Sequence, residues 1–160
     1  MNYNRNERGA TVAEFAVVAL LFFTIIIGII EFGRLMYTHN ALTEATRAGA
    51  RYAVLHHGAT ADDAMAVKKY VVYGPSGTFD KDGNPTSPPL IGGLTLDMVH
   101  VRFDGTGTPP VYGTNLGSAT VWIENYEFNL SIPVIGRTLT LPKYTTTSMA
   151  ESAGNDPPDI

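Results

Sequence analysis

Glu14 is the residue with the clearest chemical consequence in this sequence, because it is an acid near the start of a long run of apolar side chains. Neither Lys nor Arg occurs within four residues on either side of it. A charge at the centre of a bilayer costs roughly 2.5–3.5 kcal/mol, and the smaller cost near the interface still requires compensation. Cleavage of the peptide bond between Gly9 and Ala10 would give Ala10 a free ammonium one helical turn before Glu14. The spacing predicts that this amine, or that of a neighbouring subunit, pairs with the Glu14 carboxylate.

The element that carries Glu14 is predicted to cross a membrane. No charged residue occurs from Phe15 to Ile30, and the 21 residues from Ala10 to Ile30 would cover ~32 Å as a helix, against a hydrocarbon thickness of about 30 Å. Residues 1–9 are polar and include Arg5 and Arg8, which favours a cytoplasmic location for that end. We therefore expect a single-pass membrane protein with a cytoplasmic N-terminus and an extracytoplasmic C-terminal head.

An uncleaved signal anchor is the alternative interpretation of the same segment. The apolar run ends at Ile30-Glu31, with no small-x-small cleavage site after it, so an ordinary secretory signal is disfavoured. A signal anchor would hold a binding or adhesion module at the membrane without any role in a filament. Such a module has no need for Gly9 and Glu14 together, and these two residues therefore discriminate between the alternatives.

Three blocks of residues resemble a known family. Arg8-Gly9 followed by Ala10-Thr11-Val12-Ala13-Glu14-Phe15 is similar to the processing site of type IV prepilins. The blocks Gly28-Ile29-Ile30-Glu31-Phe32-Gly33-Arg34 and Ala45-Thr46-Arg47-Ala48-Gly49-Ala50-Arg51 extend the resemblance to TadE-like pseudopilins of the Tad (tight adherence) branch. The similar region covers roughly residues 8 to 55. Members of this family often have a proline in the apolar segment, where this chain reads Val18-Ala19-Leu20.

The resemblance implies a specific route of maturation and use. A prepilin peptidase would remove residues 1–9 by cutting between Gly9 and Ala10, leaving Glu14 and Phe15 as the fifth and sixth mature residues. The product would be a minor pseudopilin of an adhesive pilus, and it would be extracellular once the pilus is assembled. The resemblance also implies that the membrane crossed is the inner (cytoplasmic) membrane. The implied partners are the peptidase, other pilin and pseudopilin subunits, the inner-membrane assembly platform and membrane lipid.

The pattern beyond the membrane predicts that the helix continues over residues 10–57, since the first proline is Pro75. Ala41, Ala45, Ala48 and Tyr52 recur at helical spacing and form a seam of mostly small residues. This seam either packs on the protein's own sheet or contacts neighbouring subunits. The pairs Glu31 with Arg34 and Glu44 with Arg47 have i,i+3 spacing, and we expect them to be exposed and without function.

Residues 58–153 are predicted to form an α+β head, which gives the whole chain a pilin-like α+β fold. A second, short helix should begin after Thr60 and stop by Gly74, and a loop rich in Gly and Pro should follow to Gly93. Alternation predicts a small antiparallel sheet, with strands from Leu94 to Phe103, from Ala119 to Ile132 and from Arg137 to Met149. Residues 154–160 are expected to be a flexible tail.

Several functional classes are disfavoured by composition. The net charge is −4 with no basic cluster, which argues against nucleic-acid binding. The chain contains no cysteine, so thiolate chemistry is excluded. We read His56-His57-Gly58 as a helix end rather than a metal site, and Asp80 to Asn84 as an Asp-Gly turn rather than a calcium loop. The sequence contains no recognisable catalytic acid-base pair, nucleophile elbow, phosphate loop or His-Glu-x-x-His helix, and we expect no enzyme and no cofactor.

Overall fold

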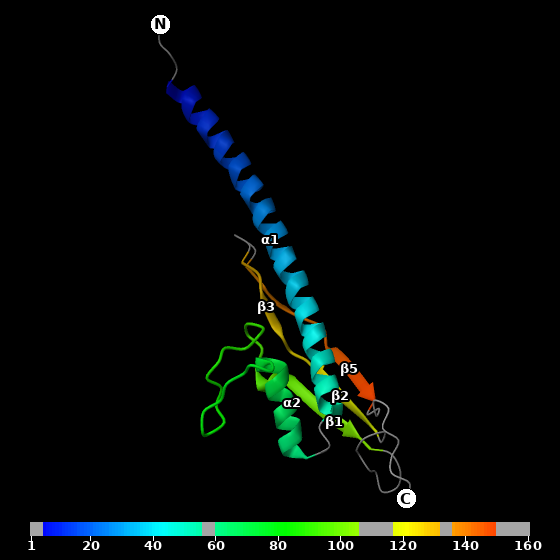
Figure 1. Cartoon of the computed structure of the whole chain (residues 1–160). Helices are drawn as coiled ribbons and strands as arrows, with labels where there is room; N and C mark the ends of the chain where they lie inside the picture. Colours follow the sequence, from blue (N-terminus) through cyan, green and yellow to red (C-terminus); the bar gives the residue numbers. More distant parts are fainter. Residues whose placement is uncertain (1–4, 56–59, 106–116, 132–135, 150–160) are drawn as a thin grey trace, which may run out of the picture. The chain divides into compact units, whose positions relative to one another are not determined.

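A computed structural model describes residues 5–55, 60–105, 117–131 and 136–149 of the chain, and for residues 5–8 it describes the backbone alone. The elements follow in the order α1 (Arg5–Leu55), α2 (Ala61–Tyr73), a 3-10 turn (Leu96–Met98), β1 (Val99–Asp104), β2 (Ser118–Ile123), β3 (Glu127–Asn129), β4 (Thr138–Thr140) and β5 (Tyr144–Met149) (Figure 1). This is the predicted α+β arrangement of one long apolar helix, one short helix and a small antiparallel sheet.

The two helices follow from local signals in the sequence. α1 is 51 residues long and begins at Arg5, inside the expected leader. α2 starts with a capping box: Asp63 N donates to Thr60 Oγ1 (3.2 Å), and Thr60 N donates to Asp63 Oδ2 (3.1 Å). It ends at Gly74, whose φ of 72° and N–H bond to Tyr70 O stop the helix. The predicted limits of the second helix are therefore confirmed.

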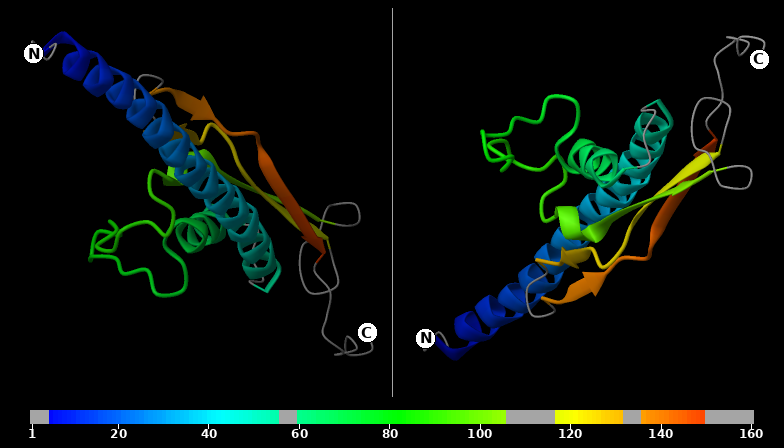
Figure 2. Two further views of the ribbon diagram at one scale, coloured as in Figure 1. Left: turned by 90° about the horizontal axis from the view of Figure 1, so that it is seen from above. Right: turned by 90° about the horizontal axis from the view of Figure 1, so that it is seen from below.

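The main sheet is antiparallel and has three strands in the order β1-β2-β5. Val99 pairs with Ile123 across β1 and β2, and Val121 pairs with Thr146 across β2 and β5. α2 and the C-terminal part of α1 lie on one face of this sheet (Figure 2). The strand β5 is at an edge of the sheet, and Pro142, which has no backbone N–H to donate, lies just before it.

The prediction of one continuous strand from Ala119 to Ile132 is wrong, because the chain forms two separate strands there. β2 ends at Ile123, and Asn125 adopts a left-handed conformation with φ 61°, so the ladder breaks before β3 starts at Glu127. β3 pairs with β4 in a separate two-stranded sheet. In this hairpin Leu130 N donates to Arg137 O (3.0 Å), and Thr138 Oγ1 donates to Asn129 Oδ1 (2.9 Å).

The first predicted strand also begins later than expected. Leu96–Met98 forms one 3-10 turn, and the extended chain starts only at Val99. Leu94, Leu96 and Met98 alternate with polar residues as in a strand, although they do not form one. The turn explains why the apolar positions change from even numbers up to Met98 to odd numbers from Val99 on. The expected loop from Gly74 to Gly93 is confirmed, with a single bridge between Phe79 and Pro85.

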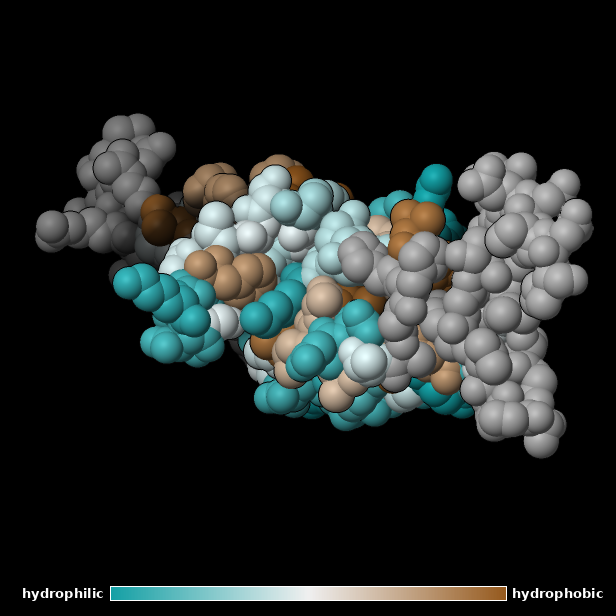
Figure 3. Space-filling model, turned by 60° about the horizontal axis from the view of Figure 1, so that its bottom comes forward, coloured by the Kyte–Doolittle hydropathy of each residue, from teal (hydrophilic) through white to brown (hydrophobic). Residues whose placement is uncertain are grey.

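The chain divides into two compact units, one of Met1–Tyr37 with Phe128–Leu139 and one of Thr38–Glu127 with Thr140–Ile160. The second unit contains most of the buried apolar residues, including Leu42, Val67, Leu94, Val121 and Ile123. The face shown in Figure 3 mixes hydrophilic and hydrophobic areas over the described residues. The core of the head is therefore built where α2, the sheet and the end of α1 meet.

Candidate membrane-anchor and assembly site

The predicted cleavage site lies within the first turns of α1. Gly9 and Ala10 are exposed, and a Cβ atom added at Gly9 would meet no atom within 4 Å. Glu14 and Phe15 follow on the same helix, and Phe15 is 73% exposed. Among the described side chains, no ion pair to Glu14 is formed within this single chain. Glu14 is thus a carboxylate on an open helix surface, available to a positive charge from outside the chain.

The apolar side chains around Glu14 project outward on all sides of α1. One helix in the described chain is long and apolar enough to cross a membrane. An 18-residue stretch of it has a mean hydropathy of 2.7, and only 6% of that stretch is buried. A core helix of a soluble protein would be mostly covered, so its low burial separates α1 from that class. The exposed large apolar residues of the run are Val12, Phe15, Val17, Val18, Leu20, Leu21, Phe22, Phe23, Ile25, Ile26, Ile29 and Ile30. An exposed apolar surface of this extent marks a site of contact with a membrane or with other proteins.

The polar group inside this run is satisfied by the helix itself. Thr24 Oγ1 donates to the Leu20 carbonyl at 2.8 Å, which is the i−4 pattern that Thr adopts where water is absent. Gly28 has open space around it, so the surface there is free of protein contacts. This part of α1 is therefore compatible with a bilayer, both in its side chains and in its hydrogen bonds.

The pair Glu31 and Arg34, predicted to be exposed, is instead partly buried. The side chain of Glu31 is only 8% exposed, and its buried Oε2 lies 3.0 Å from Arg34 Nη2 in an ion pair without hydrogen-bond geometry. Arg34 also donates to the Asn129 carbonyl and lies 4.6 Å from the centre of the Phe128 ring. Sequence reasoning missed this cluster because β3 lies some 95 residues away along the chain. The expected exposure of Glu44 and Arg47 is confirmed, at 74% and 65%.

The face of α1 that packs in the second unit lies one residue away from the predicted seam. Its fully or almost fully buried residues are Leu42, Thr46, Gly49, Ala50 and Ala53. A Cβ atom at Gly49 would lie 2.3 Å from Val71 of α2 and 3.4 Å from Val121 of β2, so only glycine lets these elements approach. One sequence signal marks this face, since Leu42 is the only large aliphatic residue between Thr38 and Ala53.

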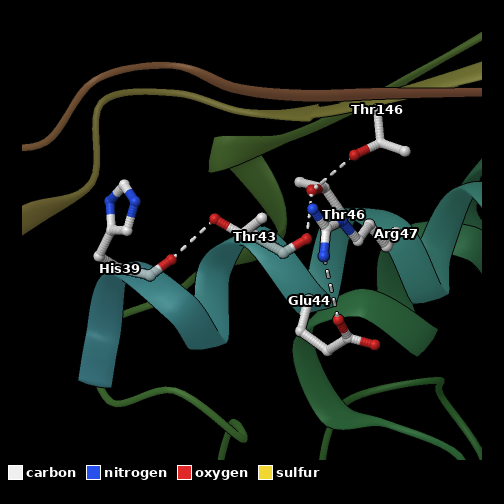
Figure 4. A network of polar contacts seen from close by, with 6 residues as sticks. All are labelled: His39, Thr43, Glu44, Thr46, Arg47 and Thr146. Carbon is white, nitrogen blue, oxygen red and sulfur yellow. Dashed lines mark hydrogen bonds and ion pairs between the residues drawn. The ribbon is translucent and has the colours of Figure 1, made fainter. Parts of the chain in front are cut away.

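Hydroxyl groups connect this face to the sheet (Figure 4). Thr46 Oγ1 donates to the Thr43 carbonyl (2.8 Å) and lies 3.0 Å from Thr146 Oγ1 on β5, while Thr43 Oγ1 donates to the His39 carbonyl (2.9 Å). Nearby, His39 Nδ1 lies 2.8 Å from the hydroxyl of Tyr144, whose burial raises its pKa above the ordinary value of 10.0. These contacts fix β5 to α1.

The seam residues Ala41, Ala45, Ala48 and Tyr52 are all half-buried. Tyr52 stacks on Tyr70 of α2 with ring centres 4.2 Å apart. Beside this stack runs an open groove of about 470 Å³, lined by Glu44, Arg47, Ala48, Arg51, Tyr52, Leu55 and Tyr70. The seam therefore borders the protein's own α2 on one side and solvent on the other, and its role between subunits stays a prediction.

The other candidate sites have simple structural roles where they can be described. Asp80 Oδ1 accepts from the backbone N–H groups of Asn84 (2.8 Å) and Asp82 (3.0 Å), and these bonds lower the pKa of Asp80 below 3.8. With Gly83 at φ 81°, this is the expected Asp-Gly turn. Within the described ranges, no three His, Asp or Glu side chains are grouped as metal ligands would be. His56-His57-Gly58 lies outside the described residues.

Comparison with known proteins supports the resemblance seen in the residues. A family model described as TadE-like protein matches residues 9–51, which begin at Gly9 and include Glu14 and the later blocks up to Arg51. Neither the curated proteins nor the solved structures give a significant match to the chain. The matched segment coincides with α1 almost to its end. Residues 9–51 of this chain are thus similar to the TadE-like family, as their motifs predict.

Proposed function

We propose that this protein is a TadE-like minor pseudopilin, cut by a prepilin peptidase between Gly9 and Ala10 and used in assembly of a Tad-type adhesive pilus. The match of residues 9–51 to the TadE-like family supports a structural, pilus-associated role. The observation that carries the proposal is the exposed apolar surface of α1 with Glu14 near its beginning. A surface of this kind suits two successive environments, the bilayer before assembly and a bundle of subunit helices afterwards.

Glu14 would act as the register residue in the change between these environments. In the membrane its charge lies near the interface, where snorkelling lowers the cost. In a filament the ammonium of Ala10 from a neighbouring subunit would meet the carboxylate, and two opposite charges ~4 Å apart attract by about 4 kcal/mol at an effective dielectric constant of 20. The pairing would therefore favour one axial position of a subunit over others.

The proposed localisation follows from the same helix. Arg5 and Arg8 would keep the leader in the cytoplasm, α1 would cross the inner membrane over residues 10–30, and the head would be extracytoplasmic. The peptidase, the assembly platform and other pilin subunits would then all meet α1. The structural character of the matched family and the absence of any recognised catalytic motif in the sequence support a protein without enzymatic activity.

Replacement of Glu14 by Gln tests the assembly role, because it keeps the side-chain shape and removes the charge. We expect normal membrane insertion and at least about a tenfold loss of this subunit from sheared surface pili, given the size of the ion pair. Glu44→Gln is the matched control, since Glu44 is an exposed acid on the same helix outside the apolar run. Equal pilus content in the two variants would contradict the role of Glu14 and favour a signal-anchored module.

A further inference from the structure

The proposed cleavage point lies inside a helix. α1 begins at Arg5 and continues without interruption through Gly9 and Ala10 (Figure 1). In an α-helix each N–H donates to the carbonyl four residues earlier, so helical pairing engages the Gly9 carbonyl with the N–H of Ala13. The same pairing engages the Ala10 N–H with the carbonyl of Asn6. Both sides of the amide to be cut are therefore used by the helix.

An amide in this conformation is a poor substrate for hydrolysis. Catalytic groups have to come within ~3–3.5 Å of the reacting carbonyl carbon, and hydrogen-bond donors have to take over its oxygen as negative charge develops there. In the helix that oxygen faces the next turn and already accepts a backbone N–H. The form that a peptidase can cut is therefore one in which the chain around Gly9 and Ala10 is unwound.

The position of the cleavage point limits how far this unwinding extends. It can start from the first residue of α1, only four residues before Gly9, so the helix opens from its end and not from its middle. On the other side, no charged residue occurs from Phe15 to Ile30, and unwinding there would leave backbone groups without partners in the proposed bilayer. The opened segment therefore ends before Phe15.

The residues between these limits favour the unwound form. Residues 9–14 are all exposed, so intrinsic helix propensity acts on them without cover from other elements. Gly9, Thr11 and Val12 are poor helix formers. In place of Ala, Thr or Val shifts the helix–coil equilibrium about threefold toward the unwound form, and Gly shifts it about fivefold. Together the three residues favour unwinding by a factor on the order of 50 over an alanine segment.

We propose that Gly9, Thr11 and Val12 set the rate of processing by favouring an unwound segment before Phe15, which is the form that the peptidase cuts. The inference rests on the proposed cleavage and adds a conformational requirement to it. Water is the second reactant in the step. The bond between the Gly9 carbonyl carbon and the Ala10 nitrogen breaks, the oxygen of water joins Gly9 as a carboxylate, and both hydrogens of water end on Ala10 as part of its ammonium.

Substitutions at Val12 test the proposal, because Gly and Ala are both smaller than Val but lie on opposite sides of it in helix propensity. The full chain is reconstituted in vesicles with the prepilin peptidase of its native host. The kcat/KM for release of residues 1–9 is then measured by mass spectrometry. We expect Val12→Gly to be cut about twofold faster than the wild type, and Val12→Ala about threefold more slowly.

Val17 provides the matched control, since it is 68% exposed against 67% for Val12 and lies beyond Phe15. Val17→Gly and Val17→Ala should both be cut at the rate of the wild type. Effects at Val17 equal to those at Val12 would contradict an opened segment that ends before Phe15, and would overturn the inference.

The order of the rates at position 12 separates the inference from the proposed cleavage. A peptidase that reads the size of this side chain would give Ala a rate between those of Val and Gly. That order, or equal rates for the three residues, would overturn the inference and leave processing after Gly9 intact. A wild-type chain that the peptidase does not cut would overturn both.

Discussion

The two parts of α1 form one continuous helix but have opposite surroundings. Before Ile30 the large side chains are apolar and exposed, while after Thr38 the helix buries Leu42, Thr46 and Ala53 within a compact unit. The first part is apolar on all sides, and the second has one buried face with exposed charges such as Glu44 and Arg47 elsewhere. Two parts of one helix can therefore need different surroundings, because the distribution of apolar residues around the helix determines whether it packs on protein along one face or is covered on all sides.

Truncation of a leucine should give the largest contrast between the two parts. Leu42→Ala removes a fully buried side chain and should lower the free energy of unfolding of the head by about 2–5 kcal/mol. Leu21→Ala, at a position that is 63% exposed, should leave it unchanged within about 0.5 kcal/mol. The free energies of unfolding of both variants are measured by urea unfolding in mild detergent, followed by the fluorescence of Trp122 in β2, the one tryptophan of the sequence. Equal losses would show that the first part also packs on protein.

Addition of one methyl group to a glycine sharpens the comparison. Gly49→Ala would place Cβ 2.3 Å from Val71, and we expect a loss of about 1–3 kcal/mol from overpacking. Gly28→Ala meets nothing within 4 Å, and the better helix propensity of Ala should leave α1 equally or more stable, by up to about 1 kcal/mol. The same urea titration, with helix content from circular dichroism, checks the opposite signs. A destabilising Gly28→Ala would contradict the open surface of the first part.

Ionisation of Tyr144 should give a smaller effect, confined to the second part. Burial raises its pKa above 10.0, so the folded protein holds the proton more tightly than the unfolded chain. Its contribution to stability is therefore fully present below pH 10 and is lost as pH rises through the folded pKa. Tyr144→Phe should cost about 1 kcal/mol at pH 8 through the lost contact with His39.

The control for this prediction is the pH dependence itself. The wild-type urea midpoint should fall further between pH 8 and pH 11 than that of Tyr144→Phe, because the variant lacks the group that titrates. If the urea midpoint changes equally with pH in the two proteins, Tyr144 ionises alike in the folded and unfolded states. Glu44→Gln, on the exposed face of α1, should show the same change of urea midpoint with pH as the wild type.

Local signals in the sequence predicted those elements that depend on neighbouring residues. Thr60, Asp63 and Gly74 define α2 because caps act within one helical turn. The break at Asn125 was not predicted, since nothing in the alternation of Tyr126 and Phe128 indicates a left-handed residue before them. The burial of Glu31 was missed for a different reason: it depends on β3, whose position beside α1 is a tertiary property.

The sequence likewise predicted some features of α1 and not others. Spacing and resemblance alone single out Gly9, Glu14 and Phe15, whose roles stay predictions, and the family match begins at Gly9. The packed face of α1 was predicted one residue out of phase, because the pattern of small residues at Ala41 and Ala45 was as regular as the pattern that includes Leu42. Which of two regular stripes faces the sheet is decided by contacts such as those of Gly49 with Val71 and Val121.

Processing of the chain after Gly9 can be tested on the N-terminus of the protein isolated from its native membrane. Intact-mass and N-terminal peptide mass spectrometry should be applied to wild type and to Gly9→Val, a change that the open space around Gly9 accommodates. We predict a wild-type chain that begins at Ala10 and a variant that retains residues 1–9. A wild-type chain that still carries these residues would rule out processing after Gly9 and identify α1 as an uncleaved signal anchor.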